Sequence, residues 1–272
     1  FRKCGDCDLT GKLTPYVVHN DWHEEVFWQP TPDGTVLNND FYGGNFKGIT
    51  EKMDYIASLG TTVLYLNPIS KSFSSHRYDT GDYKVPDPML GTLEDFREMV
   101  DCAHAHGIKV ILDGVYSHTG SNSLYFDREG AFGGKGAYCS KESPYYSWYQ
   151  FYNYPNSYNS WWGFTTLPTV NKNDPSFRRF IISGKNSVVA HWLRAGASGW
   201  RLDVADELPM DFIAGFRDTM KAADPESALI GEVWEDPSRK VSYGKLRCYC
   251  QGDTLDSTMN YPLRDAVLDF FL

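Results

Sequence analysis

The sequence predicts an α/β protein with a parallel sheet, because short runs rich in β-branched residues alternate with segments of helical periodicity. Five runs are expected to form strands, and they are residues 61–69, 108–116, 199–204, 228–234 and 254–261. The chain of 272 residues is long enough for a parallel α/β barrel, which needs about 250 residues. The order of elements fits a barrel and a doubly wound sheet equally well.

Four helices are expected between these strands: residues 49–59, residues 92–107, residues 174–196 and a helix that begins at Pro209. Thr92 is a suitable N-cap, with Asp95 three residues later. Asp174 is followed by a proline, which favours the first position of a helix. These signals place a helix before or after each predicted strand.

Residues 119–170 interrupt this alternation. They are dense in Gly, Ser, Asn, Tyr and Trp and contain no long periodic segment. We interpret them as an inserted subdomain, since long loops in compact proteins usually carry function and exposed aromatic rings suit flat ligands such as sugars. The alternative is a mobile, tyrosine-rich surface excursion.

Composition excludes several classes of partner. There are 26 Lys and Arg against 35 Asp and Glu, and the resulting net charge of −9 disfavours nucleic acid. No apolar run approaches the roughly 18 residues of a membrane span, so no membrane partner is expected. The six cysteines are expected to be unlinked thiols rather than a zinc site; they are Cys4, Cys7, Cys102, Cys139, Cys248 and Cys250. Unpaired thiols without an export signal favour a cytoplasmic location.

Polar side chains lie where four of the predicted strands end. They are His76, Tyr78 and Asp79 after the first strand, Asp113 and His118 at the second, Arg201 and Asp203 at the third, and Glu232 and Trp234 at the fourth. The carboxyl ends of parallel strands meet at one edge of the sheet, where ligands bind. These side chains are therefore expected to come together.

Two carboxyl groups in this set have the properties that cleavage of a glycosidic bond requires. Arg201 and Asp203 are two residues apart on a strand, so they share a face and the guanidinium is expected to keep Asp203 ionised. Glu232 follows aliphatic residues, and burial there favours the protonated form that a general acid needs. The alternative is a structural network of buried ion pairs.

Several motifs in fixed order carry a family resemblance. They are FYGGNFKGITEKMDYIASLGTTVLYLNPI, SSHRYDTGDY, DGVYSH, GWRLDVADE and GEVWED. Together they resemble the α-amylase superfamily of glycoside hydrolases, over about residues 39–272. Three segments look most like the neopullulanase and cyclomaltodextrinase branch of this superfamily. They are the run FYGGNFKGI, the VADE that ends the GWRLDVADE motif, and the MNYP at residues 259–262.

The resemblance implies a (β/α)8 TIM barrel with a small domain B inserted after the third strand. Only about strands 2 to 6 are expected here: residues 1–118 and 171–272 belong to the barrel and residues 119–170 are domain B. The family's third catalytic Asp has no counterpart in the sequence after Glu232. The chain is therefore expected to be a piece of a longer protein and to be inactive alone.

The resemblance also implies roles for individual residues. Asp203 corresponds to the catalytic nucleophile and Glu232 to the general acid/base, with Arg201 holding the nucleophile. Substrate-binding roles fall on Tyr78, Asp79, His118 and Trp234, and Asp113 is the structural aspartate near the site. No metal ligand is assigned.

The activity implied for the full-length protein is retaining hydrolysis of α-1,4-glucosidic bonds in maltodextrins, starch, pullulan or cyclodextrins. The alternatives are a transglycosylase of the same family and a non-catalytic carbohydrate-binding fragment. The chemistry needs no cofactor. Structural calcium is in question, because Asn45 stands where the family often has Asp. In a separate departure from the family, Ser117 replaces the Asn before the histidine. An α-glucan is the expected partner, and the oligomeric state, with a homodimer as one alternative, stays open.

Overall fold

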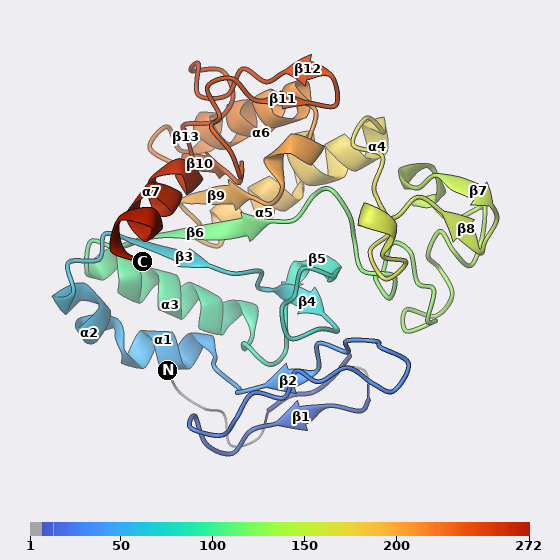
Figure 1. The fold of residues 1–272 in the computed structure, drawn as a ribbon, viewed down its shortest axis with the longest axis horizontal. Coiled ribbons are helices and arrows are strands. Elements are labelled where there is room, and N and C mark those ends of the chain that lie inside the picture. The colour runs from blue at the N-terminus through green and yellow to red at the C-terminus, as the bar shows by residue number, and fades with distance from the viewer. Residues whose placement is uncertain (1–6, 13) are drawn as a thin grey trace.

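The computed structural model describes residues 7–12 and 14–272 and is built around a five-stranded parallel sheet (Figure 1). The strands are β3 (Val63–Leu66), β6 (Lys109–Gly114), β9 (Gly199–Leu202), β10 (Ala228–Gly231) and β13 (Ser257–Thr258). Each lies within a run that the sequence predicts to be a strand, so that prediction is confirmed. Their spatial order is their order in the chain. A doubly wound sheet reverses its order at a switch point, so this sheet is wound in one direction, as in a barrel.

The register of the central strands aligns the polar groups. Asp113 on β6 pairs with Arg201 on β9, and Arg201 pairs with Ile230 on β10. Side chains at paired positions of parallel strands point to the same face. Asp113, Arg201 and, two residues beyond Ile230, Glu232 therefore project to one side of the sheet.

The helices follow the predicted order with three differences. They are α1 (Phe46–Glu51), α2 (Met53–Ser58), α3 (Leu93–Ala105), α4 (Pro175–Arg178), α5 (Val188–Arg194), α6 (Met210–Ala223) and α7 (Tyr261–Phe271), with single turns η1 (Tyr146–Trp148), η2 (Trp161–Gly163), η3 (Arg179–Ser183) and η4 (Ala205–Glu207). The capping box of Thr92 and Asp95 is present at the start of α3, as predicted. The sequence analysis does not predict α7.

The single helix predicted for residues 174–196 is wrong, because the chain leaves the helix at Gly184. This residue has extended dihedral angles, and a Cβ atom on it would lie 2.7 Å from the carbonyl oxygen of Arg179. The helix resumes only after Ser187, whose hydroxyl accepts a hydrogen bond from the Ala190 amide. The predicted helix 49–59 is likewise divided, at Lys52.

The core lies between the sheet and helices α3, α5 and α6. Phe96, Trp192, Trp200 and Phe216 are almost completely buried. The Phe96 and Trp192 rings meet edge to face at 5.2 Å, and the indole N–H of Trp192 donates to the Tyr83 carbonyl. Each large ring thus buries apolar surface without leaving a polar group unsatisfied.

Short strands outside the central sheet form small ribbons that the sequence analysis does not predict. They are β1 (Val17–Val18) with β2 (Asp40–Phe41), β4 (Ser70–Ser72) with β5 (Thr80–Pro86), and β11 (Val241–Ser242) with β12 (Lys245–Leu246). The β4–β5 hairpin has the greatest bearing on the site. Its connecting loop carries His76, Tyr78 and Asp79 to the carboxyl end of the sheet.

Residues 119–170 form an excursion beside the sheet, on the right of Figure 1, with β7 (Phe151–Asn153) and β8 (Ser157–Tyr158) as its strands. Its centre is Phe126, whose ring contacts Tyr149 and Tyr158 edge to face. Many of its tyrosines therefore pack against one another. The domain boundaries proposed for this segment stay a prediction.

Two further observations concern the part of the chain that the structure describes. None of its helices combines the length and the apolar character that crossing a bilayer requires. No disulfide joins its cysteines. Cys4 lies outside the described residues.

Candidate active site

A cavity of about 960 Å³ lies at the carboxyl end of the sheet. All seven residues predicted to act on or bind a ligand line it: Tyr78, Asp79, His118, Arg201, Asp203, Glu232 and Trp234. Strand β9, the residues that follow β10, the β4–β5 loop and the 119–170 segment each contribute to its wall. The structure therefore brings together residues that are up to 156 positions apart in the chain, from Tyr78 to Trp234.

Arg201 is the centre of this site. Its Nη1 donates to Asp203 Oδ1 at 2.9 Å and to Asp113 Oδ1 at 2.9 Å, and its Nη2 lies 2.7 Å from Glu232 Oε1. Because one guanidinium group contacts both Asp203 and Glu232, their carboxyl groups lie closer together than the roughly 9.5 Å upper limit for glycosidase pairs. The two carboxyl groups therefore share one cation, and their roles as nucleophile and general acid/base stay a prediction.

Asp113 contacts the same guanidinium nitrogen of Arg201 as Asp203 does. Its Oδ2 accepts hydrogen bonds from Tyr65 Oη at 2.6 Å and from Tyr78 Oη at 3.0 Å. Burial raises the pKa of Asp113, against the lowering effect of Arg201. The sequence analysis does not identify Tyr65, although a tyrosine among the aliphatic residues of β3 is a signal for a hydroxyl group with a specific partner.

The charge state of Asp203 differs from the prediction. Arg201 is expected from the sequence to keep this carboxylate ionised, but burial raises the pKa of Asp203 to about 7, with the negative charge of Asp113 as the next cause. The guanidinium lowers the pKa by less than these two effects raise it. Three carboxyl groups share one positive charge, which explains the outcome.

This raised pKa gives a testable dependence of stability on pH. In the unfolded chain the Asp203 carboxyl group titrates near 3.8, so between about pH 4 and pH 7 the folded state keeps a proton that the unfolded state loses. Folding stability from this group therefore falls as pH rises through that window. Asp203→Asn removes the titration, and we expect its melting temperature to exceed that of the wild type by about 5 °C or more at pH 8. A difference in Tm that stays constant from pH 4 to pH 8 would contradict the assignment.

Glu232 is held by the backbone as well as by Arg201. The Val204 amide donates to its Oε2 at 2.8 Å, and Tyr261 Oη lies 3.4 Å from its Oε1. Val204 has a positive φ of 41°, which is rare for a β-branched residue and costs roughly 1–3 kcal/mol. The strained backbone directly after Asp203 therefore directs an N–H group toward the second carboxyl group.

His118 is fully enclosed and uncharged. Burial lowers its pKa to about 4. Its Nε2 donates to the Tyr78 carbonyl oxygen at 3.1 Å and its Nδ1 accepts from Ser117 Oγ at 2.9 Å. Both ring nitrogens thus have partners in the protein. The Tyr78 carbonyl oxygen can only accept, so it fixes the tautomer, and Ser117, which replaces the family's asparagine, donates to the other nitrogen.

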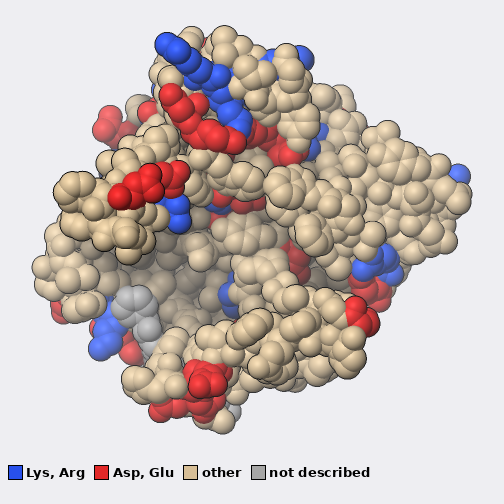
Figure 2. Space-filling model, in the orientation of Figure 1, with Lys and Arg blue, Asp and Glu red and all other residues tan. Residues whose placement is uncertain are grey.

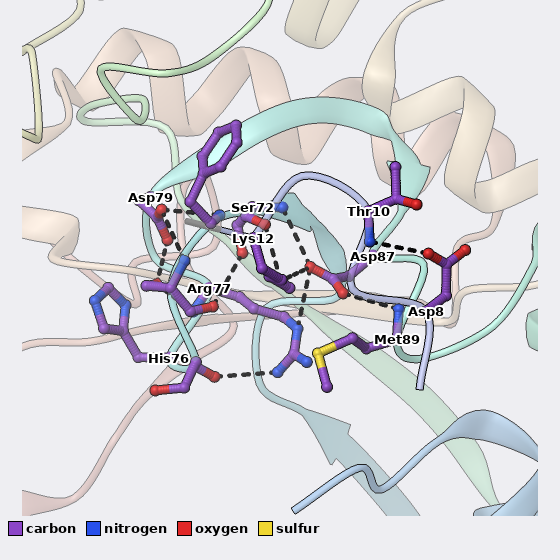
Figure 3. Close-up of polar contacts among 12 residues, drawn as sticks. Asp8, Thr10, Lys12, Ser72, His76, Arg77, Asp79, Asp87 and Met89 are labelled. Carbon is purple, nitrogen blue, oxygen red and sulfur yellow. Dashed lines mark hydrogen bonds and ion pairs between the residues drawn. The ribbon is translucent and has the colours of Figure 1, made fainter. Parts of the chain in front are cut away.

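Asp79 holds the β4–β5 loop in place (Figure 3). Its Oδ2 accepts from the amides of Phe73 and Ser74 at 3.1 Å each, and its Oδ1 accepts from Ser74 Oγ. These bonds stabilise the loop that presents Tyr78. The substrate-binding role expected for Asp79 stays a prediction.

Aromatic rings from two segments meet at the rim of the cavity. Trp234, which is 42% exposed, contacts the Trp162 ring edge to face at 5.8 Å, and Trp162 stacks on Trp161 at 5.1 Å. An exposed indole face is well suited to stack on a pyranose ring. Through this ring contact, Trp162 brings the 119–170 segment against the residues that follow β10 and include Glu232.

The loop that contains Asn45, where the family often has Asp, begins a helix in this structure. Asn45 Oδ1 accepts from the Gly48 amide and caps helix α1. Within the described residues, no group of three His, Cys, Asp or Glu side chains has a geometry that could hold a metal ion. The structural calcium considered from the sequence stays a prediction.

Comparison with known families agrees with this geometry. Residues 24–272 match the family model described as "Alpha amylase, catalytic domain". The chain is 40% identical to an amylopullulanase of Thermoanaerobacterium saccharolyticum, with 95% of this chain and 21% of that protein aligned. It is 37% identical to a cyclomaltodextrinase of Thermoanaerobacter pseudethanolicus, over 89% of this chain and 39% of that protein.

Solved structures give the same result. The type III pullulan hydrolase from Thermococcus kodakarensis superposes with a TM-score of 0.78 at 34% identity, over 96% of this chain and 43% of that one. The chain thus spans about a fifth to two fifths of the length of these relatives. The family match and the identities together assign this chain to the α-amylase family, as part of its catalytic domain.

Proposed function

We propose that the protein containing this chain is a retaining glycoside hydrolase that cleaves α-1,4-glucosidic bonds in maltodextrins, starch, pullulan or cyclodextrins. The observation that carries the proposal is the contact of one guanidinium group, Arg201, with both Asp203 and Glu232 inside a single cavity. Relatives with the names amylopullulanase and cyclomaltodextrinase support the substrate class.

The two carboxyl groups have different roles in the proposed reaction. Asp203, as carboxylate, attacks the anomeric carbon while Glu232 gives its proton to the oxygen of the leaving sugar. Glu232 then takes a proton from water, which attacks the same carbon and releases Asp203. Two inversions give net retention, and no cofactor is needed for either step.

Arg201 supports this reaction by positioning both partners. It orients Asp203 Oδ1 and holds Glu232 Oε1 on the same side of the sheet. Because the pKa of Asp203 is about 7, we expect kcat/KM to fall as the pH drops below about 7 and Asp203 becomes protonated.

Aromatic rings provide the proposed substrate contacts. Tyr78 and Trp234 line the cavity on different segments, and their faces can stack on consecutive sugar rings. His118 donates its Nε2 hydrogen to a carbonyl, so its proposed sugar contact depends on a change of partner when substrate binds. We also propose an α-glucan as the sole partner at this site and a cytoplasmic location for the protein.

The test is a product analysis with the full-length protein. Incubation with maltotriose, pullulan and a cyclodextrin, followed by separation of the products, is expected to yield shorter maltooligosaccharides from at least one of them. Glu232→Gln is expected to lower kcat by about 10²–10⁴-fold, because a general acid/base contributes that much. Glu98→Gln, an exposed change on α3, serves as the control. Binding of these sugars without any release of products would favour a non-catalytic module, and products longer than the substrate would favour transglycosylation.

A further inference from the structure

A second cavity, of about 380 Å³, adjoins the active-site cavity. Residues 36–39 and His76 line both of them. The two cavities are therefore neighbours on either side of one wall. No step of the proposed reaction uses this region.

The second cavity carries exposed aromatic rings on a fixed backbone. Trp28 is 69% exposed and Phe27 is 42% exposed. The Phe27 amide donates to Asp40 Oδ2 at 2.9 Å, and Asp40 lies on β2 and also contacts the His19 ring. The two rings thus extend from a segment tied to the β1–β2 ribbon, and no described side chain covers the greater part of the Trp28 indole.

Apart from Asp40, the described polar groups around these rings are amide, hydroxyl and imidazole groups. Gln29, Asn38 and Ser75 line the cavity with amide and hydroxyl groups. His76 accepts a hydrogen bond from the Tyr78 amide at Nδ1, so its Nε2 carries the hydrogen, and burial lowers its pKa. The lower part of the face in Figure 2, where β1 and β2 lie in Figure 1, carries mainly uncharged side chains.

This combination selects the chemistry of the ligand. Flat aromatic faces bind the apolar face of a pyranose, and amide, hydroxyl and imidazole groups bind its hydroxyl groups. The only carboxylate among the lining residues, Asp40, already accepts hydrogen bonds from Phe27 and His19. A neutral, polyhydroxylated chain fits this surface better than an anionic or cationic ligand.

We propose that the second cavity is a remote subsite for glucosyl units of the α-glucan whose reacting bond lies between Asp203 and Glu232. Trp28 stacks on one of these units. The shared wall points to the substrate chain itself as the occupant, since a linear glucan bound in the first cavity that extends past residues 36–39 reaches the neighbouring cavity. This inference rests on the proposed function, and it adds a preference for long substrates.

The test compares a short and a long ligand by isothermal titration calorimetry. Full-length protein carrying Asp203→Asn, which prevents turnover, is titrated with maltotriose and with maltoheptaose. We expect maltoheptaose to bind more tightly, and Trp28→Ala to weaken its binding about tenfold while changing maltotriose binding less than twofold, because one stacking contact is lost. Trp28→Phe, which keeps an aromatic face, is expected to retain most of the affinity.

Tyr152→Ala is the matched control, because Tyr152 is a 65% exposed aromatic residue that lines neither cavity. It is expected to change neither affinity. Unchanged maltoheptaose affinity in Trp28→Ala, or equal weakening for both ligands, would overturn the subsite and leave the proposed function intact. Failure of the Asp203→Asn protein to bind either sugar would overturn both. A change of oligomeric state in Trp28→Ala with unchanged sugar affinity would assign the surface to a protein contact and overturn the subsite.

Discussion

Asp203→Asn is expected to lower kcat on α-glucans by about 10⁴-fold or more in the full-length protein. The amide keeps the size of the carboxylate and can still accept from Arg201 Nη1, but it lacks the negative charge that attacks the anomeric carbon. The release of reducing sugar measures the effect, and circular dichroism verifies the fold. Because the variant is also expected to be more stable at pH 8, unfolding cannot explain its loss of activity.

The control for this substitution is Asp101→Asn, an exposed aspartate on α3. It is expected to keep wild-type kcat. Activity of Asp203→Asn within about tenfold of the wild type would show that Asp203 is not the nucleophile. The buried carboxylates around Arg201 would then be the structural ion-pair network that the sequence leaves open as the alternative.

The second large effect is expected at Lys12, whose side chain is completely buried (Figure 3). Its Nζ donates to Asp87 Oδ2 at 2.5 Å and to the Ser72 carbonyl oxygen at 2.8 Å. The Asp87 carboxylate is fully buried as well, and among the described residues one other cation lies near it, Arg77 Nε at 3.5 Å. Lys12→Met removes the ammonium group and leaves the Asp87 charge without adequate compensation.

We expect Lys12→Met to lower the free energy of unfolding by about 3–5 kcal/mol, the range for a buried ion pair that loses one partner. Urea unfolding followed by circular dichroism measures it. Lys135→Met, on an exposed loop, is the control and is expected to change stability by less than about 0.5 kcal/mol. Adding Asp87→Asn to Lys12→Met should restore part of the loss. A change below about 1 kcal/mol for Lys12→Met would contradict the account.

Lys12 also connects the N-terminal segment to the site. Asp87 accepts a hydrogen bond from the Ser72 amide, and Asp79 accepts hydrogen bonds from the amides of Phe73 and Ser74. Two buried carboxylates therefore hold three consecutive backbone amides where the β4–β5 loop begins. The loop then carries His76 and Tyr78 to the cavity. Destabilisation at Lys12 is therefore expected to disturb substrate binding as well as folding.

The sequence was sufficient to predict the central sheet and the acidic pair. Strands such as 108–116 are nearly continuous in β-branched and aliphatic residues, and their periodicity is visible without tertiary information. The spacing of Arg201 and Asp203 on one strand dictates that they share a face. Glu232 joins them because β10 pairs with β9 in a register that places Ile230 opposite Arg201.

Other features depend on contacts between distant segments. At the helix break, Gly184 lies close to the Arg179 carbonyl oxygen. The sequence does not reveal this break, because the apolar periodicity continues past Gly184. In the sequence Lys12 resembles an ordinary surface lysine, because its partner Asp87 lies 75 residues later in the chain. The balance that raises the pKa of Asp203 requires the burial and the positions of all three carboxyl groups, which no pairwise rule supplies.

The central claim, that Asp203 and Glu232 form a nucleophile and acid/base pair, is tested most directly by trapping the covalent intermediate. In full-length Glu232→Gln, α-maltosyl fluoride can react with Asp203 because fluoride leaves without a proton, whereas water is no longer activated to release the sugar. Mass spectrometry of the digested protein is expected to find a maltosyl group on the peptide that contains Asp203. A maltosyl group on another carboxylate, or hydrolysis to the β-anomer of maltose without any adduct, would contradict the account.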